Sequence, residues 1–440
     1  MKKTFLFDLI AGLTVSFAAL SLGAAFGLMS GRGAISGIIG AAVIPLITSL
    51  LGGTRIQASG PTAPMTAVTA VIIAFAHDEF AHNNVYAEQL ITLTLLFSSL
   101  LIIMTGLFRL GKYIKFVPQV VVLGFMNGIG VLIWVDQIKL LLGLNGKGLS
   151  GNMGVNVILT LSTLLLIYSI PYLFRKLKVP TSISRFLPSI LITILIITFC
   201  TTYFQIDVEK VKLDSEFKSF QDYWRLIVSY FPSESSLYSW KTFLLITPYA
   251  IQLCVLAYLD SLLTSLVIDR ITKEKTKPNK ELIAQGIANT ASTLLQGIPG
   301  AQATIRSVLL VNEGAKTRLA GVILAVFTLL GFLVFSNLIT LIASAVFVGI
   351  LLKAGLDVLD RDFVMSYVKN YWHKDRKRNV QLIFITYTTL VTVLVNLNVA
   401  VITGTLAFYL LKRFVEITDS EADFSEVHAE ELLGTPVAKK

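Results

Sequence analysis

Long apolar stretches, separated by short charged segments, run through almost the whole chain. Of its 440 residues, 54% are hydrophobic and 15% are charged, whereas soluble domains average about 45–50% and about 25%. A helix needs about 20 apolar residues to cross a bilayer, so the chain is long enough for about fourteen spans. A soluble core of this composition would leave large apolar areas in water. The sequence therefore excludes a soluble enzyme and predicts an all-α protein that crosses the lipid bilayer many times.

The predicted spans form two sets of seven on either side of a long loop. The first set occupies residues 1–203, the loop residues 204–241, and the second set residues 242–416. Because seven is odd, the second set must enter the membrane in the opposite orientation, which is typical of inverted-repeat transporters. We place the spans at residues 5–29, 33–52, 62–77, 86–107, 117–142, 154–174, 184–203, 242–268, 281–296, 303–314, 317–336, 337–355, 379–397 and 399–416.

Basic residues gather in alternate loops and give the orientation. The runs 269–280 and 373–378 are strongly basic, whereas the loop 77–84 is acidic and the loop 204–241 carries both signs. By the positive-inside rule, both termini lie in the cytoplasm and the long loop lies outside. With no cleavable signal expected, the predicted location is a bacterial inner membrane. The net charge of +10 is thus interpreted as a topology signal, and no nucleic-acid partner is predicted.

Glycine and proline interrupt the third predicted span of each half. The interruptions lie at residues 52–64 and 296–304, and each precedes an unusually short apolar run. Such segments at corresponding positions indicate a substrate site near the membrane midplane, rather than ordinary kinks or interfacial loops. Two half-helices that begin there would offer free N–H donors and together about one positive charge. This arrangement suits an anion.

A carboxylate, Asp260, lies in the middle of the eighth predicted span. A charge there costs about 2.5–3.5 kcal/mol on insertion scales, so it needs a partner and marks a functional candidate. Thr264 lies four residues later on the same helical face. A carboxylate, a hydroxyl and nearby carbonyls form an all-oxygen set that suits a hard cation such as Na⁺. The alternatives are a proton on Asp260, or a buried carboxylate that caps the broken backbone of the tenth segment.

Two further charged residues lie near the predicted breaks. Arg306 follows the second break and could add a positive charge to the anion site, snorkel towards water, or pair with Asp260. Glu281 begins the ninth span and is interpreted as a helix N-terminal charge. The two cysteines, Cys200 and Cys254, form no motif, and the four histidines are dispersed, so no metal cluster or cofactor is predicted apart from the coupling ion.

Together these segments resemble the SulP sulfate-permease family, which includes the animal anion exchangers and prestin. The resemblance is carried by residues 8–15, 50–66, 259–269 and 279–307, and it extends over nearly all of residues 5–416. It implies the seven-plus-seven inverted repeat shared with uracil permease. It also implies a core domain of spans 1–4 and 8–11, a gate domain of spans 5–7 and 12–14, and elevator-like movement of the core against the gate.

Within this family, residues 296–304 (QGIPGAQAT) are most similar to the cyanobacterial sodium-dependent bicarbonate transporters. That likeness implies that bicarbonate lies between two dipeptides at the starts of the half-helices, Thr62-Ala63 and Ala303-Thr304. It implies a sodium site made by two side chains and by backbone oxygens of one segment, namely Asp260, Thr264 and the oxygens around Gln302, Ala303 and Thr304.

Three positions depart from the family pattern. Gln302 replaces a small residue, and Ser21 stands where the family usually has proline in the first span, which leaves the shape of that helix open. Arg306 resembles the basic residue of the animal exchangers and the sulfate-type members. Two half-dipoles and Arg306 sum to about +2 before Asp260 is counted, a charge that could take sulfate as readily as bicarbonate.

We therefore expect a secondary active transporter of small inorganic anions, with Na⁺/bicarbonate symport as the leading interpretation. Sulfate/H⁺ symport and uncoupled anion exchange or a channel are the alternatives. A membrane-embedded enzyme is disfavoured, because the sequence shows no nucleophile–base pair, metal set or phosphate loop.

The last 24 residues differ from the usual family pattern, in which a soluble STAS domain follows the last span. Residues 417–440 are short, polar and acidic, so we expect a disordered cytoplasmic tail. STAS-mediated regulation and dimerisation are not carried over. The sequence leaves the oligomeric state open, with a homodimer as one option.

Overall fold

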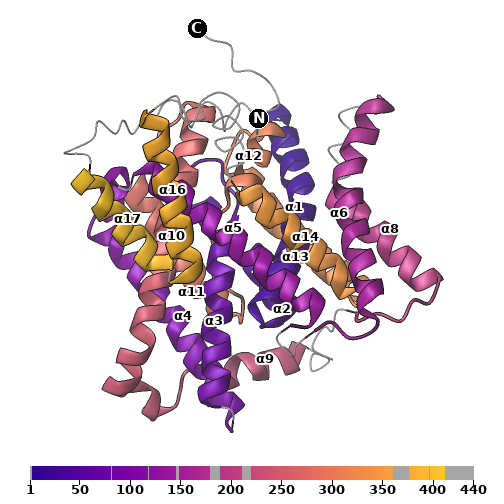
Figure 1. Ribbon diagram of the computed structural model, residues 1–440, viewed down its shortest axis with the longest axis horizontal. Coiled ribbons are helices and arrows are strands. Elements are labelled where there is room, and N and C mark those ends of the chain that lie inside the picture. Colours follow the sequence, from indigo (N-terminus) through magenta and orange to yellow (C-terminus); the bar gives the residue numbers. More distant parts are fainter. Residues whose placement is uncertain are drawn as a thin grey trace. The chain divides into compact units, whose positions relative to one another are not determined.

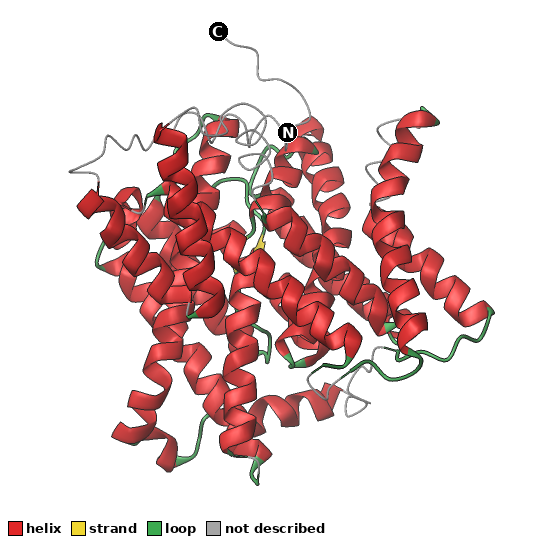
Figure 2. Ribbon diagram, in the orientation of Figure 1, coloured by secondary structure: helices red, strands yellow, loops and turns green. Residues whose placement is uncertain are grey.

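The computed structural model describes residues 2–80, 82–116, 118–144, 148–178, 189–210, 220–359, 376–395 and 397–411, and these are almost entirely helical (Figure 2). The first half contains α1 (Lys2–Ser30), α2 (Gly33–Leu51), α3 (Ala63–Glu79), α4 (Asn84–Leu107), η1 (Leu110–Phe116), α5 (Gln119–Leu142), α6 (Met153–Lys176) and α8 (Ser189–Tyr203). Then follow α9 (Phe220–Ser229), η2 (Ser235–Tyr238), α10 (Trp240–Thr272), α11 (Pro278–Leu294), α12 (Thr304–Asn312), α13 (Leu319–Ile339), α14 (Ser344–Val358), α16 (Arg376–Leu394) and α17 (Leu397–Leu411).

The prediction of an all-α, multi-pass membrane protein is confirmed. Six helices of the described chain are long and apolar enough to cross a membrane, and the longest, α10, has 33 residues. The count of fourteen spans stays a prediction. One helix was not expected: α9 lies inside the predicted loop 204–241. The predicted tail, residues 417–440, lies outside the described residues.

The chain divides into two compact units. The larger comprises Met1–Lys112 and Leu141–Ile350, and the smaller comprises Tyr113–Leu140 and Leu351–Lys440. All eight helices of the expected core, α1–α4 and α10–α13, belong to the larger unit, together with α6 and α8. The units therefore cut across the predicted halves, whose boundaries at residues 203, 241 and 416 stay predictions.

Within the larger unit the helices pack in corresponding pairs (Figure 1). Helix α1 packs on α2 and α13, and α10 packs on α11 and α4. Likewise α13 packs on α2, while α4 packs on α11. These packing pairs match if the first four helices correspond in order to α10–α13, as the predicted inverted repeat requires, and the repeat itself stays a prediction.

Small residues allow α1 and α2 to cross closely. A β-carbon at Gly37 would overlap the carbonyl oxygen of Gly23, and one at Gly27 would overlap the carbonyl oxygen of Gly33. Glycine permits this approach of the two backbones, as it does in many membrane helix pairs. The crossing brings the start of α2 next to the end of α1.

We predict that Gly37→Ala destabilises the larger unit by about 2 kcal/mol, since the added methyl group forces two backbones apart. Thermal unfolding of the purified protein in detergent measures this. Gly331→Ala is the matched control, because a β-carbon at Gly331 meets only the end of the Leu20 side chain, at 3.3 Å. Equal melting temperatures for the two variants would contradict the prediction.

Candidate functional site

The two interrupted segments meet inside the larger unit as a pair of two-residue antiparallel strands, β1 (Ser59–Gly60) and β2 (Ala301–Gln302). Ser59 pairs with Gln302, Gly60 pairs with Ala301, and the Ala303 amide donates to the Ala58 carbonyl at 3.1 Å. Helix α3 follows β1 and helix α12 follows β2, so the two short helices leave the crossing in opposite directions (Figure 1). Their N-termini lie at the crossing, as the sequence predicts.

The crossing depends on one glycine in β1 and one directly before β2. Gly60 has φ of +143°, a conformation that side chains rarely adopt. A β-carbon at Gly300 would overlap the Gly60 carbonyl group. The two backbone segments therefore approach one another at Gly60 and Gly300 with no side chain between them.

Polar side chains of α11 hold the segment that leads into β2. Asn289 bonds both polar groups of Gly300: its Oδ1 accepts from the amide at 3.0 Å, and its Nδ2 donates to the carbonyl at 2.9 Å. Gln285 donates to the same carbonyl at 2.9 Å, and Ser292 donates to the Ile298 carbonyl at 3.0 Å. These side chains are fully buried. They give the broken backbone the partners that lipid cannot supply.

The five residues predicted for the cation site lie at or beside the crossing. The Thr264 hydroxyl donates to the Gln302 carbonyl at 3.1 Å and lies 2.6 Å from the Thr304 hydroxyl. Asp260, one turn earlier on α10, accepts from the Thr62 hydroxyl at 2.9 Å and is 9% exposed. The Ala303 carbonyl accepts from the Ser307 amide at 2.9 Å, in the first turn of α12. The structure thus gathers an all-oxygen set from α10, β2 and α12.

Arg306 lies at the crossing and is 2% exposed. Its Nη2 donates to the Pro61 carbonyl at 2.8 Å, while its Nη1 is buried and has no partner among the described residues. A β-carbon at Gly60 would lie 2.9 Å from Nη1. Arg306 therefore neither snorkels to water nor forms an ion pair with Asp260, and its charge stands next to the start of α3.

The unusual Gln302 fits without disturbing its backbone carbonyl. Its side-chain Oε1 accepts from the hydroxyls of Ser265 at 2.8 Å and Thr54 at 3.4 Å. Its backbone amide donates to the Ser261 hydroxyl at 3.3 Å. The side chain therefore points towards α10, and the carbonyl faces Thr264. The other departure, Ser21, donates to the Phe17 carbonyl at 2.9 Å inside an unbroken α1. Serine keeps the backbone N–H that proline lacks, so the helix continues.

Sequence reasoning missed the role of Glu281. This carboxylate is fully buried and accepts from the amides of Gly53 at 2.7 Å and Thr54 at 2.8 Å, and from Gln57 Nε2 at 3.2 Å. It therefore anchors the segment that leads into β1, rather than only favouring the start of α11. The available signal was an acidic residue in a span whose only other charged residue is its neighbour Lys280.

A polytopic helical protein in which two half-helices begin at one buried crossing, beside a carboxylate, has the architecture of a secondary transporter. The model of the sulfate permease family matches residues 5–386. The chain belongs to this family of anion transporters.

Two curated relatives and one solved structure illustrate the similarity. The bicarbonate transporter BicA of Picosynechococcus sp. is 31% identical over 414 residues, which cover 90% of this chain and 68% of that protein. YvdB of Bacillus subtilis, provisionally assigned as a sulfate transporter, is 29% identical over 418 residues, or 93% of this chain and 74% of that protein. The transmembrane domain of a cyanobacterium BicA superposes with a TM-score of 0.75 at 28% identity, covering 91% of this chain and 98% of that domain.

We predict that Asn289→Ala abolishes most transport and lowers stability by about 2 kcal/mol or more, because both polar groups of Gly300 lose a buried partner. Anion uptake and thermal unfolding measure the two effects. The neighbouring Thr290→Ala removes a hydroxyl that bonds only within its own helix, to the Gly286 carbonyl, and serves as the control. Wild-type uptake by Asn289→Ala would show that α11 does not hold the crossing.

Proposed function

We propose that the chain is a Na⁺-coupled bicarbonate symporter. The observation that carries this proposal is the position of Asp260 between the starts of the two short helices. Asp260 accepts a hydrogen bond from Thr62, the residue directly before α3. Thr264, one turn later on α10, bonds Thr304 at the start of α12. A cation at Asp260 and Thr264 would therefore stand next to the N-termini where bicarbonate would bind. The similarity to proteins named as bicarbonate transporters supports this choice of anion.

Charge explains why the two ions would bind together. The two helix N-termini contribute about one positive charge in total and Arg306 contributes another, while Asp260 subtracts one. Na⁺ at Asp260 would neutralise the carboxylate and raise the affinity for the anion. By thermodynamic linkage, the anion would raise the affinity for Na⁺ by the same factor.

We also propose an elevator mechanism. Every residue assigned to the two ions lies in the larger compact unit. A displacement of that unit as a whole would carry both ions across the membrane together. The proposed location is a bacterial inner membrane with both termini in the cytoplasm, because the basic loops alternate along the chain.

A second candidate is sulfate/H⁺ symport, and Arg306 is the observation that favours it. A buried guanidinium with one free nitrogen beside the crossing suits a divalent anion. In this version Asp260 would carry a proton in place of Na⁺. The similarity to YvdB is compatible with it.

We predict that Asp260→Asn abolishes the sodium dependence of bicarbonate uptake, since the amide retains a hydrogen bond to Thr62 but carries no charge. Tracer uptake into proteoliposomes, with an inward Na⁺ gradient or with choline, measures this. We expect at least about a tenfold loss of the sodium-driven rate, the scale of one charge-assisted contact.

Asp207→Asn is the matched control for Asp260→Asn, because Asp207 is an exposed aspartate in the loop that follows α8. Sodium-driven uptake at the wild-type rate in Asp260→Asn would refute the cation assignment. Proton-driven uptake that sodium does not affect in the wild type would select the sulfate/H⁺ alternative.

We predict that Arg306→Gln weakens inhibition by sulfate about tenfold or more, while bicarbonate uptake falls less, because a divalent anion depends more on the guanidinium charge. The measurement is the concentration of sulfate that halves tracer bicarbonate uptake. Arg175→Gln is the control, because Arg175 is an exposed arginine in the last turn of α6. Equal effects on both anions would show that Arg306 does not select between them.

A further inference from the structure

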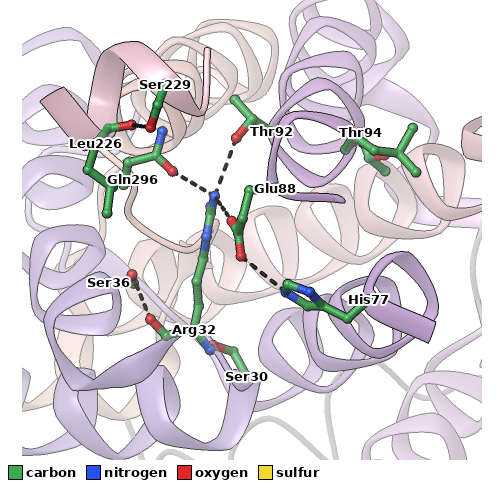
Figure 3. Close-up of polar contacts among 11 residues, drawn as sticks. Ser30, Arg32, Ser36, His77, Glu88, Thr92, Thr94, Leu226, Ser229 and Gln296 are labelled. Carbon is green, nitrogen blue, oxygen red and sulfur yellow. Dashed lines mark hydrogen bonds and ion pairs between the residues drawn. The ribbon is translucent and has the colours of Figure 1, made fainter. Parts of the chain in front are cut away.

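A buried polar cluster surrounds Arg32, the residue between α1 and α2 (Figure 3). The Arg32 side chain is only 6% exposed. One of its nitrogens, Nη2, makes three contacts: with Gln296 Oε1 at 2.6 Å, Glu88 Oε2 at 2.9 Å and Thr92 Oγ1 at 3.3 Å. The other carboxylate oxygen of Glu88 lies 3.2 Å from His77 Nε2. None of these residues takes part in the ion site described above.

Gln296 is the first residue of the segment that leads into β2, and its backbone is strained. Its φ of +59° is in the left-handed region, which is uncommon for residues other than glycine. Such a conformation persists only where the surroundings hold it. Arg32 supplies that hold through the side chain of Gln296. Two residues further on, the Ile298 amide donates to the Ser36 carbonyl of α2 at 3.1 Å. The segment is therefore held at two points, by Arg32 and by Ser36.

A neighbouring helix adds to this hold. The Tyr223 hydroxyl of α9 donates to the carbonyl of Leu295, the residue before Gln296. Burial raises the pKa of Tyr223 to about 12, and the positive charge of Arg32 acts in the opposite direction. The turn at residues 295–296 is therefore held by a charged side chain and by a phenol that stays protonated.

The other break is held in a corresponding way. Glu281, at the start of α11, binds the amides of Gly53 and Thr54 before β1. Arg32, at the start of α2, binds Gln296 before β2. Since α2 and α11 occupy corresponding places in the two halves, each break is fixed by a buried charge from the second helix of the opposite half.

We propose that Arg32 is a positioning residue for the ion site. Through Gln296 it fixes residues 296–303, and thereby the place of the α12 N-terminus relative to that of α3. Glu88 extends this control to α3, because His77 near the end of α3 bonds the same carboxylate. Arg32 thus acts on anion binding without touching the anion. This inference rests on the proposed transport function.

The test is the dependence of uptake on bicarbonate concentration, with the full chain in proteoliposomes under a fixed Na⁺ gradient. Arg32→Gln should raise KM for bicarbonate about tenfold, the scale of a lost charge-assisted bond, with little change in the maximal rate per folded molecule. Arg32→Lys should largely retain the wild-type KM, because a single nitrogen makes all three contacts. A fall in maximal rate alone, at unchanged KM, would overturn the proposal.

A double-mutant cycle tests the route through Gln296. Gln296→Leu should raise KM, and the double variant should be no worse than Arg32→Gln alone, because Arg32→Gln already removes the contact with Gln296. Effects that multiply would overturn this route. Arg175→Gln, which removes an exposed arginine in the last turn of α6, is the matched control and should leave KM unchanged.

Amide hydrogen exchange separates this proposal from the proposed function. In Arg32→Gln, amides within residues 297–303 should exchange at least about tenfold faster than in the wild type, while those of α6 should not change. Unchanged exchange at residues 297–303 overturns the positioning role, whatever the transport result. If the wild type takes up neither bicarbonate nor sulfate, the proposed function fails, and the exchange rates still decide the role of Arg32.

Discussion

The structure depends on the need to satisfy backbone polar groups where two membrane helices are interrupted. Lipid supplies no hydrogen-bond partners, so each free N–H or C=O must find one inside the protein. Here the two interrupted segments partly satisfy one another through β1 and β2. Asn289 and Gln285 form hydrogen bonds with the backbone of Gly300. Glu281 accepts hydrogen bonds from the backbone amides of Gly53 and Thr54. The pairing of β1 with β2 leaves the first polar groups of α3 and α12 available, and these are the groups proposed to face the ions.

Much of this site could be predicted from the sequence because its signals are local. Glycine and proline in an apolar run mark a broken helix wherever the rest of the chain lies. Asp260 and Arg306 stand out because charge is costly in such surroundings. The spacing of Asp260 and Thr264 places both on one helical face. These features needed no knowledge of tertiary contacts, and the structure brings the five residues predicted for the cation site to one crossing.

The contacts that hold the site could not be predicted in the same way, because their partners are far apart in the chain. Glu281 and Gly53 are separated by 228 residues, and Arg32 and Gln296 by 264. From the sequence alone, an acidic residue in the first turn of a helix, such as Glu281, is explained by its interaction with the helix N-terminus. The continuous α1 at Ser21 and the grouping of α6 and α8 with the larger unit likewise depend on packing.

The absence of a side chain at Gly60 and at Gly300 limits which substitutions the crossing tolerates. No residue larger than glycine fits at Gly300, and Gly60 has a backbone conformation that other residues rarely adopt. Mutations at these positions would damage the scaffold before they could alter its preference for an anion. Under the proposed assignment of the anion site, a change of substrate would come from neighbouring positions such as Thr62, Thr304 and Arg306. Anion preference can therefore diversify only through the few residues around the crossing, while the two glycines of the crossing itself stay fixed.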